Sequence, residues 1–302
     1  METARYLLLS LVLGGLCVWV SENLFWMMPP PGLTLADLAL TVLAYSIAAA
    51  VALSAVIWTG VGGLTAAFLG GAIMGYMSEG VIVGTIYEGV PLQMVWTPLS
   101  WHALLTGALV LGVGRAQLPA GRMVLIWAGL GFAGAYWAQF WTSERPGQPE
   151  PWLFALYMLG FGLVVPLAHV VMDRLGALPR PKPWVLWVAP AIALAVWLLQ
   201  TITTMNPLRL MLPAVLVLIL WIMRRLGQKG ATVALGGGPM ARHGLFLITP
   251  VIIVILAPLG WAQGWGTLEA NWVVAGIASL AALIWLGRLI WRSAAKRTQS
   301  SA

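Results

Sequence analysis

The stretch from Gly70 to Gly107, GGAIMGYMSEGVIVGTIYEGVPLQMVWTPLSWHALLTG, combines long apolar runs with three ionisable side chains, Glu79, Glu88 and His102. The chain around it is 61% hydrophobic and only 8% charged, so these groups stand out from their surroundings. A carboxylate at the centre of a bilayer costs roughly 2.5 kcal/mol or more. An ionisable residue in such a setting therefore indicates a functional site.

The composition indicates an all-α membrane protein with many transmembrane helices. The mean hydropathy is +0.91, and apolar runs of about 20 residues, the length needed to cross a bilayer, recur from end to end. No segment between these runs is long enough to bury a core of its own, so residues 1–302 are predicted to form a single transmembrane domain. The net charge of +7 is expected at cytoplasmic helix ends near lipid headgroups, and it does not indicate nucleic acid binding.

We predict about ten spans, separated by Gly- and Pro-rich breaks such as those at 29–32, 143–151, 178–183 and 236–239. The first span has a basic residue before its apolar run, as a signal peptide does, but it is too long and lacks a cleavage site, so we predict that it is retained. The predicted spans are Arg5–Met28, Asp37–Trp58, Val61–Ile86, Leu99–Gly114, Arg122–Trp141, Trp152–Met172, Trp184–Thr203, Leu208–Met223, Leu245–Trp261 and Asn271–Ile290.

The distribution of basic residues predicts that both termini are cytoplasmic. With the N-terminus inside, only Arg145 and Arg209 of the 16 basic residues fall outside, as the positive-inside rule requires. We therefore expect a multi-pass protein of the plasma (inner) membrane. The basic residues predicted to lie inside are Arg5, Arg115, Arg122, Arg174, Arg180, Lys182, Arg224, Arg225, Lys229, Arg242, Arg288, Arg292, Lys296 and Arg297.

A row of small residues in the third span predicts a close helix contact. Gly63, Ala67, Gly71 and Gly75 recur every four residues, which places them on one face of a helix, and Glu79 is the next position in the row. Small residues on a membrane helix let another backbone approach closely. Glu79 is therefore predicted to point into the helix bundle instead of toward lipid.

The relation between Glu79 and Glu88 has two interpretations. Nine residues separate them, so on one continuous helix they would face opposite ways. Either the helix continues to Ile86 and Glu88 is solvated at its outer end, or it breaks at Glu79–Gly80 and an irregular segment, Gly80–Thr97, brings both acids together.

Glu79, Glu88, His102, Glu22 and Asn23 all fall in the predicted outer half of the membrane, and they form the candidate substrate- or ion-binding site. Carboxylates with one imidazole can exchange protons, bind a divalent metal ion, or act as general acid and base on a lipid. If a metal is bound, Glu79, Glu88 and His102 are the predicted ligands. Their spacing matches no known metal motif, and the sequence identifies no cofactor.

The remaining histidines and the single cysteine are predicted to have no functional role. His243 lies in a basic loop, GPMARHGL, and is expected in solvent or among lipid headgroups. His169 lies near the cytoplasmic end of the sixth span, where it is expected to help cap the helix. Cys17, within the first apolar run, is expected to be buried and inert.

Ten spans in about 300 residues, with both termini inside, are similar in outline to the drug/metabolite transporter superfamily. The stretch Leu247–Gly287 resembles the closing helices of that group. The resemblance implies two inverted five-helix repeats and a transport activity. The first half departs from this pattern, because Glu79, Glu88 and His102 have no counterparts five spans later and no internal repeat is visible.

Three functions follow from these observations as hypotheses. The first is a transporter or permease for a small solute or cation, with an acidic Glu/His site in the outer half of the membrane. The second is an intramembrane enzyme, dependent on a metal or on acid–base chemistry, that acts on a lipid, isoprenoid or pigment. The third is a non-catalytic subunit or assembly factor, which the 18 tryptophans alone suggest. The expected partners are the lipid bilayer, a small-molecule, ion or lipid substrate, and either another membrane protein or a second copy of the chain.

Overall fold

The computed structural model describes residues 1–302 apart from 25–27, 29–31, 141–148, 229–239, 266–269 and 300–302. No β-strand occurs among the described residues. The α-helices are α1 (Glu2–Cys17), α3 (Leu35–Thr59), α4 (Gly63–Met77), α5 (Leu92–Val95), α6 (Ala120–Trp137), α8 (Pro151–Gly162), α9 (Val164–Leu175), α10 (Val185–Thr204), α11 (Met211–Leu226), α12 (Met240–Gly244), α13 (Ile248–Gln263) and α14 (Ala270–Gln299). The π-helical segments are η1 (Val18–Asn23), η2 (Ser78–Val83) and η4 (Trp96–Val113), and the 3₁₀ segments are η3 (Thr85–Tyr87), η5 (Pro207–Leu210) and η6 (Leu245–Leu247).

The structure confirms an all-α polytopic membrane protein. Within the described ranges, nine helical stretches are long and apolar enough to cross a membrane, and each corresponds to a predicted span. Consecutive helices combine in several of them, as α8 and α9 do in the stretch Pro151–Leu175. The predicted breaks at 29–32, 143–151 and 236–239 lie wholly or mostly outside the described residues.

Helix α6 corresponds to the remaining predicted span, Arg122–Trp141. It packs along α13 in the same direction. The Thr249 hydroxyl near the start of α13 donates to the Trp127 carbonyl at 2.8 Å, and the Trp261 indole near its end donates to the Ala138 carbonyl at 2.9 Å. Because α13 belongs to the stretch Ala241–Gln263, which is long enough to cross the membrane, a helix that runs parallel to α13 lies in the same layer.

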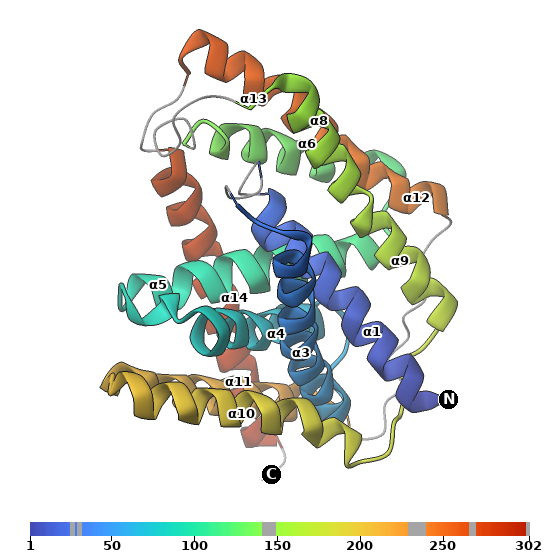
Figure 1. Ribbon diagram of the computed structural model, residues 1–302. Helices are drawn as coiled ribbons and strands as arrows, with labels where there is room; N and C mark the ends of the chain where they lie inside the picture. Colours follow the sequence, from blue (N-terminus) through green and yellow to red (C-terminus); the bar gives the residue numbers. More distant parts are fainter. Residues whose placement is uncertain (25–27, 29–31, 141–148, 229–239, 266–269, 300–302) are drawn as a thin grey trace.

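The helices gather around α4 and the π-helical segment η4. Helix α3 packs beside α4, and α1 packs against α3 (Figure 1). On one side of this group, α10 packs against α3, and α11 packs against α3 and α4. Helices α6, α8, α9 and α13 gather on the opposite side, and α14 crosses η4 and α11. In an 18-residue window of the span Gly63–Val83, 78% of the residues are buried, against 17% in the corresponding window of Val185–Thr204. The center of the molecule is therefore the stretch with the ionisable residues.

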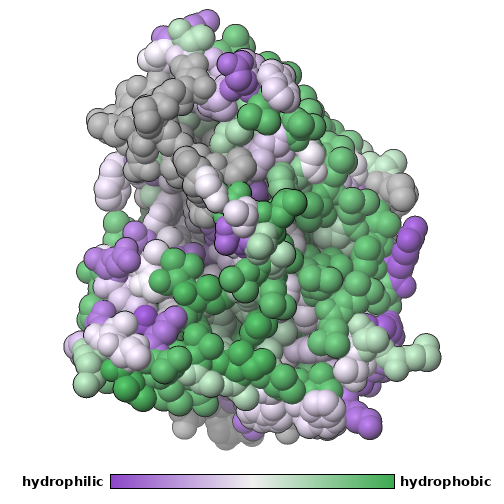
Figure 2. Space-filling view, viewed as in Figure 1, coloured by the Kyte–Doolittle hydropathy of each residue, from purple (hydrophilic) through white to green (hydrophobic). Residues whose placement is uncertain are grey.

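The outer surface is apolar, as contact with lipid requires. Figure 2 shows hydrophobic residues over most of the described surface in this view, with polar residues gathered toward its edges. Large apolar side chains on α10 and α14, including Leu199, Ile202, Ile277 and Leu280, are exposed. Such a surface would be unstable in water and is typical of helices that face a bilayer.

The row of small residues brings the backbones of α4 and η4 into direct contact. A Cβ atom added at Gly71 would lie 2.6 Å from the His102 carbonyl oxygen, and one added at Gly107 would lie 2.3 Å from the Ala67 carbonyl oxygen. At Gly75 the same atom would lie 2.7 Å from the Pro98 Cα atom. Only glycine fits at these positions, because any side chain would displace the neighbouring backbone.

Gly63, the first member of the predicted row, takes a different role. Nothing lies within 4 Å of a Cβ atom built there, and its φ of +61° falls in the left-handed region that favours glycine. Gly63 therefore provides the left-handed backbone conformation at the start of α4, whereas Ala67, Gly71 and Gly75 lie in the contact with η4.

Replacing Gly75 by alanine is expected to lower the thermal stability of the purified protein in detergent. The added Cβ atom meets the Pro98 backbone and the His102 Cβ atom at 2.7 Å, and overpacking of this kind costs about 1–3 kcal/mol. Gly129→Ala on α6 is the matched control, because nothing lies within 4 Å of a Cβ atom there. An unfolding midpoint for Gly75→Ala equal to that of Gly129→Ala would contradict the close approach of α4 and η4.

Candidate functional site

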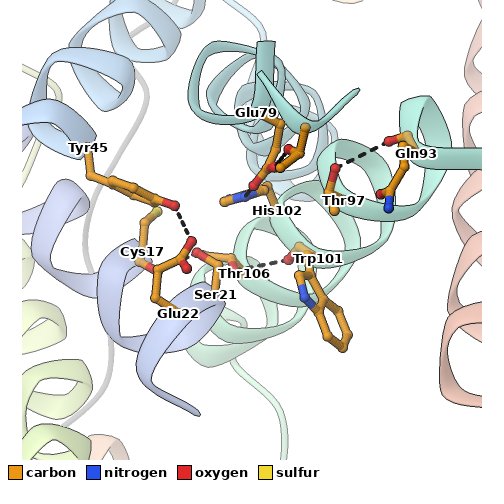
Figure 3. Close-up of polar contacts among 11 residues, drawn as sticks. Cys17, Ser21, Glu22, Tyr45, Glu79, Gln93, Thr97, Trp101, His102 and Thr106 are labelled. Atoms are coloured by element: carbon orange, nitrogen blue, oxygen red, sulfur yellow. Dashed lines mark hydrogen bonds and ion pairs between the residues drawn. The ribbon is translucent and has the colours of Figure 1, made fainter. Parts of the chain in front are cut away.

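Three of the residues predicted from the sequence meet in the interior of the bundle. Glu22 comes from η1, Glu79 from η2 and His102 from η4 (Figure 3). The His102 Nε2 atom lies 3.1 Å from Glu79 Oε1, and the donor atoms of all three residues lie within 4.8 Å of one another. Glu79 is 7% exposed and His102 is 1% exposed, so the protein shields this group, which we call the Glu–Glu–His cluster.

The contact between α4 and η4 places His102 beside Glu79. Gly75 lies one helical turn before Glu79, and a Cβ atom at Gly75 would collide with the Cβ atom of His102. The imidazole can therefore lie against the α4 backbone and reach the carboxylate at the next turn. The small-residue row and the ionisable pair belong to one structural feature.

Each member of the cluster lies in a π-helical segment. The wider turn is visible in hydrogen bonds that span five residues: the Thr106 hydroxyl donates to the Trp101 carbonyl at 3.0 Å, and the Gly84 amide donates to the Glu79 carbonyl at 2.9 Å. Short π-helical stretches are rare and occur frequently at functional sites. In this chain, η1 and η2 are short stretches of this kind that hold Glu22 and Glu79, and His102 lies in the longer segment η4.

Neighbouring hydroxyl groups hold the two carboxylates in place. The Tyr45 hydroxyl, from α3, donates to Glu22 Oε1 (Figure 3). The Thr85 hydroxyl donates to Glu79 Oε2. Gly84, with a φ of +94°, turns the chain at the end of η2 so that Thr85 can reach back to Glu79. Each carboxylate thus keeps one oxygen that no hydroxyl holds. The Nδ1 atom of His102 is buried and has no hydrogen-bond partner within the part of the chain that the structure describes.

Two further candidate residues lie outside the cluster. The third span ends at Val83, and Glu88 follows the 3₁₀ segment η3 with its side chain exposed. The exposure of Glu88 agrees with the interpretation in which it is solvated, but the helix ends at Val83 and does not continue to Ile86 as that interpretation expected. The group of neighbouring ionisable residues around Glu79 does not include Glu88. Asn23 is buried, but its amide donates to the Tyr157 hydroxyl at 2.7 Å and joins η1 to α8.

An apolar cavity of about 340 Å³ adjoins the cluster. It lies between α1, α3, α4 and η4, and His102 and Thr106 line one part of it. Leucine, alanine and glycine residues make up most of the remaining wall, among them Leu13, Ala52 and Ala66. Arg115 also lines the cavity, thirteen residues along the chain from His102, a distance of at most about 20 Å at the α-helical rise.

A second polar cluster surrounds Arg115. Its guanidinium donates to Asp173 Oδ1 at 2.5 Å, and Asp173 Oδ2 lies 2.6 Å from the Nε2 atom of His243. The rings of His169 and His243 stack with their centroids 5.2 Å apart. These contacts join the residues just after η4 to α9 and α12, so the end of the cavity is held by an ionic network.

The prediction that His243 lies in solvent or among headgroups is wrong, because its side chain is 3% exposed and paired with Asp173. Sequence analysis also missed the role of His169. One signal was present: His169 and Asp173 are four residues apart and share a helix face. The partner from α12 could not be found in this way, because nothing local connects position 243 to position 173.

Basic residues that were predicted to share the cytoplasmic side gather at this end of the bundle. Arg5 donates to the Leu175 carbonyl, and Arg242 donates to the Ala116 carbonyl. Arg5, Arg115 and Arg242 belong to three different predicted loops or helix ends. Their meeting satisfies carbonyl groups at helix ends and is compatible with the predicted alternation of the spans.

Comparisons with known proteins leave the site to be interpreted from its geometry. No protein-family model, curated protein or solved structure matches this chain. The similarity in outline to the drug/metabolite transporter superfamily therefore adds nothing to the interpretation of the site.

Replacing Asp173 by asparagine is expected to lower the unfolding midpoint in detergent, because the cationic Arg115 would lose its carboxylate partner. Breaking a buried ion pair costs about 3–5 kcal/mol, and the 24% exposure of Asp173 reduces our expectation to about 1–3 kcal/mol. Glu150→Gln is the control, because that carboxylate is exposed and makes no capping bond to α8. Equal midpoints for the two variants would show that the ionic network does not stabilise the bundle.

Proposed function

We propose that this protein is an intramembrane enzyme that acts on a long-chain lipid, isoprenoid or pigment molecule at the Glu–Glu–His cluster. The observation that carries the proposal is that His102 belongs both to the cluster and to the wall of the apolar cavity. A molecule that fills the cavity would lie against the imidazole. Polar groups that converge at one part of an apolar pocket are the usual arrangement of a small-molecule site.

The lining favours an apolar substrate over a hydrophilic solute. About 340 Å³ lies within the range of small-molecule sites, roughly 300–1,000 Å³. A hydrophilic solute would lose its hydration among leucine and alanine side chains without gaining hydrogen bonds in return. A hydrocarbon or isoprenoid chain would lose nothing on leaving the lipid for this cavity and would gain packing contacts.

Arg115 suggests how such a molecule would be oriented. Its guanidinium is the cationic group of the cavity wall, and its distance from His102 suits a long chain with a polar or anionic head. The head would lie beside Arg115, and the chain would extend toward His102. In this orientation the cluster would act on the apolar part of the substrate.

A permease for a cation or small solute is the second candidate. Its support is the buried pair of carboxylates, since acidic residues inside a membrane are typical of ion pathways. The irregular segments η1, η2 and η4 also support a permease, because transporters often form their ion sites where helices depart from regular geometry. Both candidates use the same cluster and differ in the molecule that reaches it.

The location follows the distribution of charge. We place the protein in the plasma (inner) membrane, with both termini and the Arg115 end of the bundle on the cytoplasmic side. The support is the positive-inside count together with the gathering of Arg5, Arg115 and Arg242 at one end. The Glu–Glu–His cluster would then lie closer to the outer face.

Ala52→Phe is expected to reduce capture of a long-chain probe by the purified protein, because the ring would occupy part of the cavity. The probe is a C15 isoprenoid alcohol that carries a photoreactive diazirine, and the attachment sites are mapped by mass spectrometry. We expect at least a tenfold loss of labelling, which corresponds to about 1.4 kcal/mol of binding free energy. Ala195→Phe, on the exposed face of α10, is the matched control.

Labelling that is equal in both variants, or that maps outside α1, α3, α4 and η4, would contradict the proposal. The permease candidate is tested in parallel with proteoliposomes, by uptake of Mn²⁺ under a proton gradient. The permease would be the better-supported function if the unmodified protein takes up Mn²⁺, Glu79→Gln abolishes this uptake, and the probe labels the protein unspecifically.

A further inference from the structure

The Glu–Glu–His cluster has the composition and spacing of a metal site. We propose that Glu22, Glu79 and His102 bind one divalent transition-metal ion. This inference rests on the proposed function and deepens it, because it names the cofactor of the same site. It also changes the ligand set expected from the sequence: Glu22 takes the place of Glu88, which is exposed and remote from the cluster.

The distances suit such an ion. Carboxylate oxygen and imidazole nitrogen bind zinc at about 2.0–2.2 Å, so two ligands at 90–109° lie about 3.0–3.6 Å apart. The Glu79 Oε1 and His102 Nε2 atoms are already 3.1 Å apart. Glu22 contributes a donor within 4.8 Å of the others, so a shift of its side chain by about 1–2 Å would close the site.

The charge of the cluster is an independent reason to expect a bound cation. Two ionised carboxylates carry two negative charges, and the described residues place no arginine or lysine in hydrogen-bond contact with either of them. Unbalanced charge inside a membrane is costly. A divalent cation neutralises both carboxylates at once, without a counter-ion from the protein.

The groups around the cluster fit the role of outer-shell partners. Tyr45 and Thr85 each donate to one oxygen of a carboxylate, which orients Glu22 and Glu79 and leaves their other oxygens for an ion.

The donor set indicates which metals would bind. One imidazole and two carboxylates suit Zn²⁺, Mn²⁺ or Fe²⁺, whereas Ca²⁺ and Mg²⁺ prefer oxygen ligands alone. Three protein ligands leave at least one coordination position open, which is the pattern of catalytic rather than structural metal sites. Because His102 lines the cavity, that open position would be accessible to its occupant.

The test is metal content and metal binding of the full-length protein in detergent. We expect about one Zn, Mn or Fe atom per chain in protein purified without chelators and measured by mass spectrometry. After removal of the metal, titration with Co²⁺ should give a visible absorption band that saturates at about one equivalent. Glu22→Gln, Glu79→Gln and His102→Gln should each weaken Co²⁺ binding at least about tenfold.

Two further variants distinguish residues that bind the metal from residues that do not contact it. Glu88→Gln is the matched control and should bind Co²⁺ as the unmodified protein does, because its carboxylate is exposed. Tyr45→Phe should weaken binding by about 10–100-fold and shift the Co²⁺ band, because Tyr45 positions Glu22 without contacting the ion. Gel filtration and the unfolding midpoint identify any variant that fails to fold.

The unmodified protein alone can overturn the inference. Metal content below about 0.1 per chain, together with no Co²⁺ band, would show that the cluster binds no transition metal. A band that persists unchanged in all three ligand variants would do the same. Labelling by the isoprenoid probe is measured separately, so loss of the metal proposal with retained labelling would leave the proposed function intact.

Discussion

The close contact between the backbones of α4 and η4 is the feature on which the rest of the structure depends. Inside a membrane, helices gain little from the hydrophobic effect, and they associate through packing and hydrogen bonds. Gly71, Gly75 and Gly107 provide that packing, because each allows the opposite backbone to approach where a Cβ atom would collide. The same contact sets His102 beside Glu79. The stability of the center and the assembly of the site are therefore not separable properties of this chain.

The free-energy cost of burying charged groups explains where these groups lie in the interior. The chain has only nine acidic residues, and two of them, Glu22 and Glu79, meet in the Glu–Glu–His cluster. A third, Asp173, joins Arg115 and His243 in the second cluster. Between the two clusters the cavity wall is almost entirely apolar. Charged groups are thus kept in two places that provide partners, and the space between them suits a hydrocarbon chain.

Much of the fold, and part of the site, follows from the sequence. Apolar runs predicted the spans, and the spacing from Ala67 to Gly75 predicted that Glu79 points inward. The selection of Glu22 over Glu88 could not be predicted, because it depends on where the third helix ends and on how η1 lies against η4. The pairing of His243 with Asp173 likewise joins segments 70 residues apart. Local patterns describe one helix at a time, whereas a site built from several helices depends on their packing.

The three π-helical segments have a consequence for how such a site can arise or be lost. A π-helical turn accommodates one residue more than an α-helical turn, and one residue corresponds to about 100° of rotation around a helix. Deleting a single residue from one of the six-residue segments, η1 or η2, would favour regular α-helical geometry and rotate the side chains that follow by about 100° away from the cluster. Substitution at Glu22, Glu79 or His102 is therefore not the only route to its loss. A single-residue deletion within these segments would remove the site while leaving every ligand residue in the chain.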